Sequence, residues 1–266
     1  RLRGNRCQRR HHPLEPGLRI LGHLAEGRML AQAVTGTTLL VDVPEAAPIL
    51  AELEARGWGV DIVLLTHHHH DHVQGLGPIR DRFSPKVAGA AADAHRLPSL
   101  DIELSEGDVL EIGTLHGEVI DVSGHTLNHI ALHVPQAKAA FTADSLMAAG
   151  CGRLFEGTPD QMFASLAKLR ALPPETLICS GHEYTTSNLT FAATVDPQNE
   201  ALQARIAKVT KARAERRATV PSRLSGELAT NPFLRANDPY IRATLGMTLA
   251  SDAEVFARLR SMKDSF

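Results

Sequence analysis

The chain has 266 residues, of which 43% are hydrophobic and 22% are charged, and its formal net charge is -2. This length and balance predict one large globular domain, or a main domain with a smaller appendage. So small a negative charge gives no support to a nucleic-acid-binding surface. No apolar run approaches the ~20 residues that cross a bilayer. Three cysteines without a CxxC pair predict a reducing compartment and no disulfide framework.

Residues 1–36 are the least informative part of the sequence. The stretch from Arg1 to His12 is rich in arginine, has no acidic residue and shows no apolar periodicity. It also lacks the apolar core of a secretory signal peptide. We therefore assign no structure to residues 1–36, and we expect a cytoplasmic protein, with import into an organelle as the alternative.

From residue 37 onward, short apolar runs alternate with segments of helical spacing. We expect strands at 38–42, 61–65, 86–88, 119–122, 130–134, 139–142 and 176–179, and helices at 44–56 and 161–172. Strands interleaved with helices predict an α/β layered domain. We expect this catalytic domain to span residues 37–184.

Residues 185–266 have a different composition. The segment 198–217 is rich in Ala, Lys, Arg and Glu, which favour a helix. Prolines at 221, 232 and 239 interrupt the chain that follows, and residues 252–263 predict a final helix. We therefore predict a smaller, mostly helical C-terminal domain.

Histidine is unusually concentrated, because five of the 14 histidines lie between His67 and His72. The run is internal and follows an apolar strand, which argues against a tag. Alternate residues of an extended chain point to the same side, so His67 and His69 can meet one metal ion. Asp71 and His72 follow where the chain turns into a helix, which can direct them to a second point. Imidazole and carboxylate are ligands of divalent metals such as Zn²⁺.

Three further candidate ligands, His125, Asp144 and His182, each lie within three residues of the end of a predicted strand. Taken alone, each suits a structural histidine or a capping aspartate equally well. Together with the cluster they make seven candidate ligands, enough for two metal ions that share one carboxylate. His68 and His70 alternate with the ligands and point away from the first metal, so we expect them to have packing or supporting roles. We expect the same of the remaining histidines, among which His129 is close to His125.

These motifs resemble those of a known family. THHHHDH at 66–72, GHT at 124–126, the strand-ending Asp144 and GHEY at 181–184 are similar to the metallo-β-lactamase superfamily. CGRLFEGT at 151–158, GHEYT at 181–185 and RSMKD at 260–264 resemble glyoxalase II. The resemblance extends from Thr37 to the C-terminus.

The resemblance implies a metallo-β-lactamase αββα sandwich of class α/β, followed by a helical substrate-binding domain. It also implies two divalent metal ions per chain, with Zn²⁺ expected and Fe or Mn as alternatives. The first ion would be held by His67, His69 and His125, and the second by Asp71, His72 and His182, with Asp144 bridging the two. Catalysis would depend on Asp144, Asp71 and a metal-bridging hydroxide.

The activity that the resemblance implies is hydrolysis of S-(2-hydroxyacyl)glutathione, chiefly S-D-lactoylglutathione, to D-lactate and glutathione. We expect the enzyme to act as a monomer. The glutathione part would be bound by Arg153, Phe155, Tyr184, Arg260 and Lys263, because Arg and Lys match its carboxylates. For Arg260 and Lys263 the alternative is a solvated helix end, where cations are favoured in any case.

Several residues beside the candidate ligands depart from the family pattern. They are Val43 for Pro, Ser123 for Pro, Asn128 for Gly, Ala143 for Gly and Ser145 for Thr. If position 143 needs a positive φ, alanine there costs about 1–2 kcal/mol. The residues before 37 also do not resemble the opening strands of the family. None of these departures removes a ligand.

Two other functions stay open. A glutathione persulfide dioxygenase of the same fold would use one iron, although the run from Arg153 to Thr158 and the C-terminal domain favour the hydrolase. A non-catalytic module that binds glutathione or a partner would not need all seven candidate ligands. A β-lactamase is disfavoured by Asp144 and the C-terminal domain, and a nuclease by the net charge.

Overall fold

A computed structural model describes residues 18–24, 27–32 and 36–266, and its strands form two six-stranded sheets and a hairpin. The first sheet contains, in spatial order, β1 (Leu18–Leu24), β2 (Gly27–Gln32), β3 (Thr38–Val41), β4 (Ile62–Leu65), β5 (Lys86–Ala90) and β6 (Ile102–Leu104). The second contains β14 (Ser222–Arg223), β13 (Leu177–Ser180), β10 (Ala139–Ala143), β9 (Ile130–Val134), β8 (Leu115–Asp121) and β7 (Val109–Ile112). The hairpin pairs β11 (Leu146–Met147) with β12 (Gly150–Cys151).

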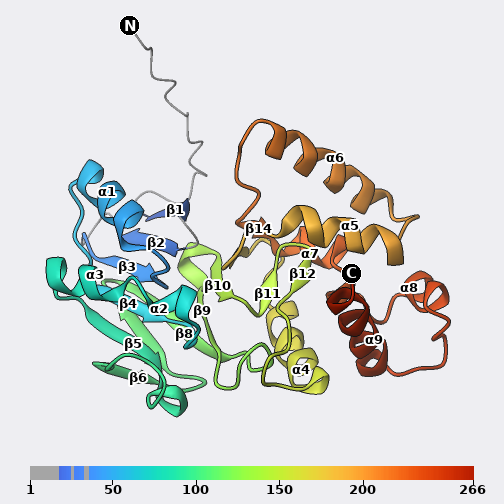
Figure 1. Cartoon of the computed structure of the whole chain (residues 1–266), viewed down its shortest axis with the longest axis horizontal. Coiled ribbons are helices and arrows are strands. Elements are labelled where there is room, and N and C mark those ends of the chain that lie inside the picture. The colour runs from blue at the N-terminus through green and yellow to red at the C-terminus, as the bar shows by residue number, and fades with distance from the viewer. Residues whose placement is uncertain (1–17, 25–26, 33–35) are drawn as a thin grey trace, which may run out of the picture.

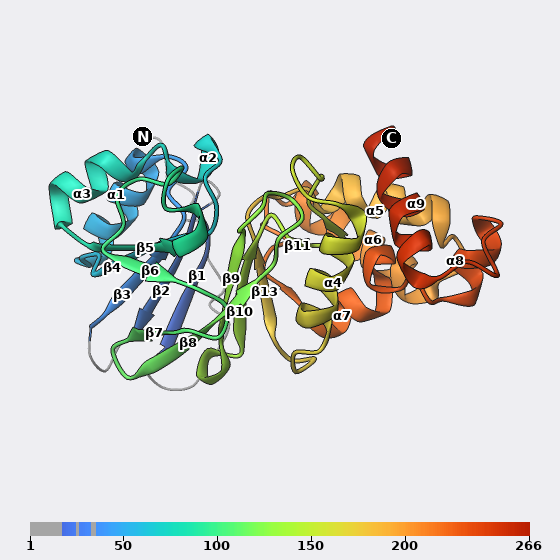
Figure 2. The same ribbon diagram turned by 90° about the horizontal axis from the view of Figure 1, so that it is seen from below.

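Helices cover the outer faces of both sheets (Figures 1 and 2). On the first sheet lie α1 (Ala46–Arg56), α2 (His70–Val73) and α3 (Leu76–Phe83). On the second lie α4 (Pro159–Arg170), α5 (Thr185–Val195), α6 (Glu200–Ala214), α7 (Leu224–Thr230), α8 (Pro239–Thr244) and α9 (Asp252–Asp264). Single 3-10 turns are η1 (Ala91–Asp93), η2 (Pro135–Ala137) and η3 (Pro232–Leu234). Within the described ranges, no helix is long and apolar enough to cross a membrane.

Alternation along the strands explains the layers. Leu39 of β3 packs with Leu132 and Phe141 of the second sheet, whereas its neighbour Leu40 packs with Ile49 of α1 on the outer side. Successive strand residues point to opposite faces, and both faces are covered here. The result is an αββα sandwich, as the sequence predicts.

The outer face of the second sheet is covered jointly by α4 and the C-terminal helices. Ala140 and Ile178 of this sheet share one apolar cluster with Met162 of α4 and Phe256 of α9. The α4 helix begins with a capping box between Thr158 and Gln161, which fixes its first turn. The C-terminal helices therefore pack on the sheet whose strands β8, β10 and β13 end at the site described below.

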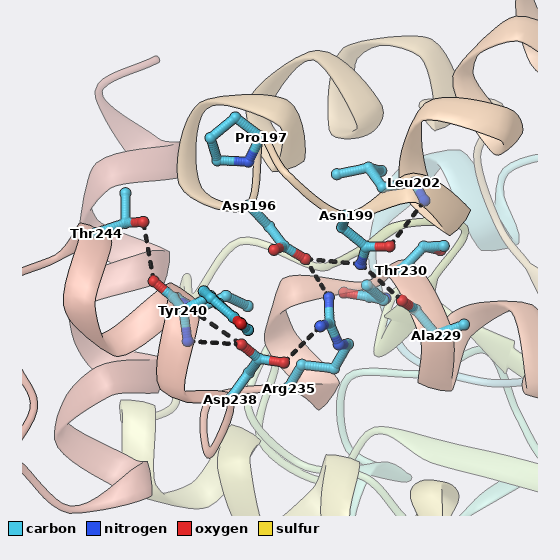
Figure 3. A network of polar contacts seen from close by, with 12 residues as sticks. Asp196, Pro197, Asn199, Leu202, Ala229, Thr230, Arg235, Asp238, Tyr240 and Thr244 are labelled. Carbon is cyan, nitrogen blue, oxygen red and sulfur yellow. Dashed lines mark hydrogen bonds and ion pairs between the residues drawn. The ribbon is translucent and has the colours of Figure 1, made fainter.

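A polar network fixes the C-terminal helices to one another (Figure 3). Arg235 donates to Asp196, at the end of α5, and to Asp238, the N-cap of α8, at 2.5 Å. Asn199, the N-cap of α6, donates to Asp196 at 2.7 Å and to the Ala229 carbonyl of α7 at 2.9 Å. Arg235 and Asn199, which both contact Asp196, thus join four helices.

The first sheet begins earlier than the sequence indicates. Strands β1 and β2 lie within residues 18–32, and β2 pairs antiparallel with β3, with Met29 opposite Leu40. The sequence alone indicates no structure before residue 37, whereas the fold has two strands of the first sheet there. The apolar residues of this segment do not alternate regularly and Gly22 interrupts them. These strands therefore form through the pairing of β2 with β3 and of β1 with β2, and not through a local pattern. The arginine-rich residues 1–12 lie outside the described residues.

The backbone at position 143 does require a positive φ. Ala143, the last residue of β10, has φ +40°, and Asn128 has φ +63°. Asparagine tolerates this left-handed region, whereas alanine is strained in it. The departure from glycine at 143 therefore carries the cost that the sequence predicts, one residue before Asp144.

We expect Ala143→Gly to raise the free energy of unfolding by about 0.5–1 kcal/mol, because relief of strain exceeds the extra entropy of the unfolded glycine chain. Urea unfolding of the variant measures this change. Ala167→Gly is the matched control, because Ala167 is exposed in the interior of α4, where glycine is destabilising by about 1 kcal/mol. A loss of stability in Ala143→Gly would mean that neighbouring contacts, and not strain, dominate at this turn.

Candidate metal centre

The candidate ligands converge because strands of both sheets end at one edge of the sandwich. In the first sheet, β3 and β4 are parallel and end before Asp42 and Thr66. In the second, β10 and β13 are parallel, and β8 runs in the same direction because β9 is antiparallel to both β8 and β10. His125, Asp144 and His182 follow β8, β10 and β13, so all three lie at that edge.

The seven side chains predicted from the sequence come together in three overlapping groups. Within each group, one ligand atom from every residue lies within 4.8 Å of the others. The groups are His67, His69 and His125; His67, His72 and Asp144; and Asp71, His72 and His182. The first and third groups match the two sets expected from the sequence, and the middle group connects them. Such His/Asp clusters are typical of a dinuclear metal site of this fold.

The Asp144 carboxylate lies at the centre of this arrangement. Its Oδ1 is 3.7 Å from His72 Nε2, and its Oδ2 is 3.5 Å from His125 Nε2 and 3.2 Å from His182 Nε2. The Asp144 residue is 5% exposed. His182 Nε2 is also 3.4 Å from Asp71 Oδ2, on a side chain that is half exposed.

Three of the histidines are held from behind by their other ring nitrogen, Nδ1. The pairs are His67 with Thr66 Oγ1 at 3.0 Å, His72 with Asp42 Oδ2 at 2.8 Å, and His125 with the Arg153 carbonyl at 2.7 Å. Such contacts fix the ring orientation of metal-binding histidines. They leave the Nε2 atoms directed toward the centre.

The inner atoms show that a metal fits this site. The Nε2 atoms of His67 and His72 and the Oδ1 atom of Asp144 are buried and have no hydrogen-bond partner among the described residues. Buried polar atoms are nearly always satisfied in native proteins. Imidazole nitrogens and a carboxylate oxygen are ligands of divalent ions such as Zn²⁺. A metal would therefore satisfy these atoms.

Burial and charge separate the protonation states of these groups. Burial lowers the pKa of His67 well below its ordinary value, and it also lowers the pKa values of His69 and His125. For His72, burial acts in the same direction, but the Asp42 and Asp144 carboxylates outweigh it and raise its pKa well above 6.5. Burial would raise the pKa of Asp144, but the neighbouring imidazoles of His182 and His72 outweigh it and hold that pKa well below its usual range. His72 is therefore the histidine of this centre whose charged form the neighbouring carboxylates favour.

The histidines without a predicted metal role have separate positions. His70 is exposed at the start of α2, and His68 contacts Asp93 at 3.0 Å. His129 is fully buried and stacks on the His67 ring at 4.6 Å, and burial lowers its pKa to about 3. It packs as a neutral ring behind the first group.

Sequence reasoning missed Asp42. Its carboxylate accepts hydrogen bonds from the Thr66 main chain and hydroxyl at 2.9 Å each and contacts His72, so it connects two strand ends. Asp42 has φ +56°, which aspartate tolerates. A polar residue at the end of an apolar strand was the available signal, similar to the one that identified His125, Asp144 and His182.

Two exposed aromatic residues flank the centre. Phe155 is 62% exposed, and its ring lies 5.5 Å from the His69 ring and 5.3 Å from the His125 ring, edge-on to both. Tyr184 is 53% exposed and stacks parallel to the His182 ring at 4.8 Å. They form two apolar walls, one beside the first group of ligands and one beside the third.

The three predicted cations gather around Asp264 near the C-terminus. Arg153 and Arg260 both contact Asp264 Oδ1, at 3.3 and 2.9 Å, and Lys263 donates to Ser187 Oγ at 3.0 Å. The Arg153 side chain is 55% exposed, whereas that of Arg260 is 6% exposed and also donates to the Cys151 carbonyl at 2.8 Å. Arg153 and Lys263 are thus accessible, and Arg260 supports the turn before Arg153 from inside.

Comparison with known proteins agrees with this geometry. Residues 29–182 match the family model of the metallo-beta-lactamase superfamily, and residues 183–266 match that of the hydroxyacylglutathione hydrolase C-terminus. The hydroxyacylglutathione hydrolases of Ruegeria pomeroyi and Cereibacter sphaeroides are 63% and 58% identical to this chain, each over 90% of it and 93% of the relative. The crystal structure of the BLEG-1 B3 metallo-beta-lactamase shares the fold, with a TM-score of 0.61 and 20% identity over 85% of this chain and 98% of that one. The chain therefore belongs to the hydroxyacylglutathione hydrolases, the glyoxalase II enzymes of the metallo-beta-lactamase superfamily.

Proposed function

We propose that this thioester hydrolase acts chiefly on S-D-lactoylglutathione, which it hydrolyses to D-lactate and glutathione in methylglyoxal detoxification. The observation that carries the proposal is the convergence of seven His and Asp side chains beside the accessible cations Arg153 and Lys263. The first feature suits hydrolysis, and the second suits an anionic peptide thioester. The names of the relatives agree with this substrate class.

In this proposal, His67, His69 and His125 hold one divalent ion, Asp71, His72 and His182 hold a second, and Asp144 is shared. When bound, such ions supply a water activated at neutral pH and a positive charge beside the scissile carbonyl. We propose Zn²⁺ as the ion, because histidine and aspartate are ligands that zinc prefers. The same ligand set can also bind Fe or Mn. All candidate ligands come from one chain, so a monomer suffices.

The chain's own residues prepare this site in two ways. The low pKa values of His67, His69 and His125 keep these imidazoles neutral at physiological pH, as metal ligation requires. Asp144, held as a carboxylate by His72 and His182, supplies the negative charge that balances two cations. The departing glutathione thiolate has an ordinary pKa of about 8.5, so its departure requires no strong acid from the protein.

The substrate's peptide part is assigned to the surface between Phe155, Tyr184 and the cations. The carboxylates of glutathione would pair with Arg153 and Lys263, and the two rings would flank the acyl-thioester end. Arg260 contributes through the Cys151 carbonyl and Asp264, contacts that hold this surface in place. Because glutathione is a cytosolic reductant, we place the enzyme in the cytoplasm.

We expect metal uptake by the metal-free protein to release about one proton near neutral pH, because His72 must lose its proton to become a ligand. Its pKa is raised, so apparent metal affinity should rise with pH until that pKa is passed. Calorimetry in buffers of different ionisation enthalpy measures the proton. In Asp42→Asn, which removes one charge that raises this pKa, less than one proton should be released. Metal binding without proton release in the unmodified protein would contradict the assignment of His72.

The proposed function is tested by elemental analysis of the purified protein together with a thioester assay on S-D-lactoylglutathione. About two metal ions per chain and rapid hydrolysis are the expected result. Two ions without thioesterase activity would assign the site to another substrate. One iron, with oxygen consumption on glutathione persulfide, would establish the dioxygenase alternative instead.

A further inference from the structure

A second cluster of charged side chains lies at the rim of the metal centre, and the reaction proposed above does not use it. Arg96 follows η1 of the first half of the sandwich, and Glu156 lies between β12 and α4. Arg96 Nη1 donates to Glu156 Oε1 at 2.7 Å, and its Nε donates to Asp93 Oδ1 at 2.6 Å. His68 completes a ring, with Nδ1 3.0 Å from Asp93 Oδ2 and Nε2 3.4 Å from Glu156 Oε1. We call His68, Asp93, Arg96 and Glu156 the rim clamp.

The rim clamp joins loops that belong to different sheets. His68 lies between the candidate ligands His67 and His69, so one side of the clamp is the metal-binding loop itself. On the other side, Glu156 Oε2 accepts from the Leu127 main chain at 2.8 Å, and Arg96 Nη2 donates to the Leu127 carbonyl at 3.2 Å. The clamp therefore connects the loop after β4, the loop after β5 and the turn that follows His125.

Glu156 directly follows Phe155, the aromatic wall beside the first ligand group. The Phe155 amide donates to the His125 carbonyl at 3.1 Å, and the Gly157 amide donates to the Gly124 carbonyl at 3.1 Å. These main-chain bonds attach the segment to the second sheet. The polar contacts of this segment with the loops of the first sheet are made by the Glu156 side chain, so we expect the distance between Phe155 and His69 to depend on the clamp.

The burial of the clamp distinguishes it from an ordinary surface ion pair. The Asp93 side chain is 0% exposed, and those of Arg96 and Glu156 are 29% and 26% exposed. Exposed pairs hold side chains only loosely. Here Arg96 donates to two carboxylates and one carbonyl, so its position is defined by three bonds.

We propose that Arg96 and Glu156 are positioning residues that hold Phe155 at the entrance of the metal centre and thereby determine how tightly the thioester binds. This inference rests on the proposed function for the nature of the substrate. The clamp touches none of the inner ligand atoms, so it acts on substrate binding and not on the chemical step. Loss of the clamp releases the Phe155 segment from the first sheet while the metal ligands stay in place.

The test compares Arg96→Met and Glu156→Gln, singly and combined, with the unmodified enzyme. Glutamine has the same shape as glutamate and keeps an oxygen that can accept from the Leu127 amide. The Glu156→Gln variant should therefore fold even if the Arg96→Met variant fails to fold. We expect KM for S-D-lactoylglutathione to rise about tenfold while kcat changes by less than about twofold. The KM of the double variant should not exceed the higher KM of the two single variants, because both substitutions break the same set of contacts. Metal content should be unchanged.

Binding of S-hexylglutathione, a thioether that cannot be hydrolysed, gives a readout independent of activity. Its Kd should weaken by the same factor as KM. If the unmodified protein binds this thioether but does not hydrolyse the thioester, the proposed function fails while the effect of the clamp on Kd is still measured.

Arg235→Met is the matched control, because Arg235 also lies between two carboxylates, Asp196 and Asp238, within the C-terminal helices (Figure 3). It should lower the melting temperature and leave KM and Kd unchanged. The proposal is overturned if the rim variants behave in the same way, with lower stability and unchanged KM and Kd. It is also overturned if their loss of binding accompanies loss of metal, which would make the cluster a support of the metal ligands.

Discussion

Asp144→Ala is expected to remove metal from the protein and to lower kcat/KM by about a thousandfold. The Asp144 carboxylate lies 3.2–3.7 Å from the Nε2 atoms of His182, His125 and His72, and it is nearly inaccessible to solvent. Alanine leaves the buried imidazoles without the anion that balances two divalent cations. Elemental analysis and the thioester assay measure the two losses separately.

The isosteric variant Asp144→Asn separates charge from shape. It fills the same space but cannot supply the anion, so we expect it to lose metal almost as completely as the alanine variant. Asp108→Ala serves as the control for removal of a carboxylate, because Asp108 is exposed in the loop before β7. Full metal content in Asp144→Asn would show that the carboxylate is not shared between two ions.

The residues at strand ends were predictable because one local pattern identifies them. A short apolar run followed within three residues by His or Asp indicates both the strand and the position of the polar side chain. The prediction for β9, residues 130–134, matches its observed bounds; β3, β4 and β10 differ from prediction by one residue at one end, and β13 is shifted by one residue. Parallel strands that end at one edge then bring the candidate ligands together, and no contact between distant residues has to be known in advance.

Features that depend on pairing between distant segments were not predictable. Asp42 and His72 are 30 residues apart, and Arg96 and Glu156 are 60 residues apart. No periodicity in one sequence indicates that such residues meet. Strands β1 and β2 are a similar case, since their existence depends on an open edge of β3.

For the predicted substrate-binding cations, the family resemblance indicates the residues, but their exposure is known only from the structure. The motif RSMKD places Arg260 and Lys263 together, but only the fold shows that Arg260 lies against the Cys151 carbonyl with its side chain 6% exposed, whereas Arg153 remains accessible. A helical spacing of three residues turns two cations toward one region without fixing their exposure.

The second large effect is expected for Gly181→Ala, which should prevent metal binding without unfolding the protein. A Cβ atom at position 181 would lie 2.3 Å from Asp144 Oδ1 and 3.1 Å from His72 Cε1. The Gly181 amide donates to the Ala143 carbonyl at 2.9 Å, so the backbone cannot readily withdraw. The Asp144 side chain must therefore move, and we expect metal affinity to fall at least about a hundredfold.

The contrast with a neutral glycine makes this prediction specific. Gly181 does not adopt a left-handed φ, so alanine there suffers from the clash alone and not from backbone strain. Gly77→Ala in α3 is the control, because no atom lies within 4 Å of its added Cβ, and it should be stabilising by about 0.5–1 kcal/mol. Circular dichroism should show both variants folded, and elemental analysis should show metal only in Gly77→Ala. If Gly181→Ala binds metal normally, Asp144 can move without loss of the site, and the close approach of strand β13 to this carboxylate is not what shapes the metal centre.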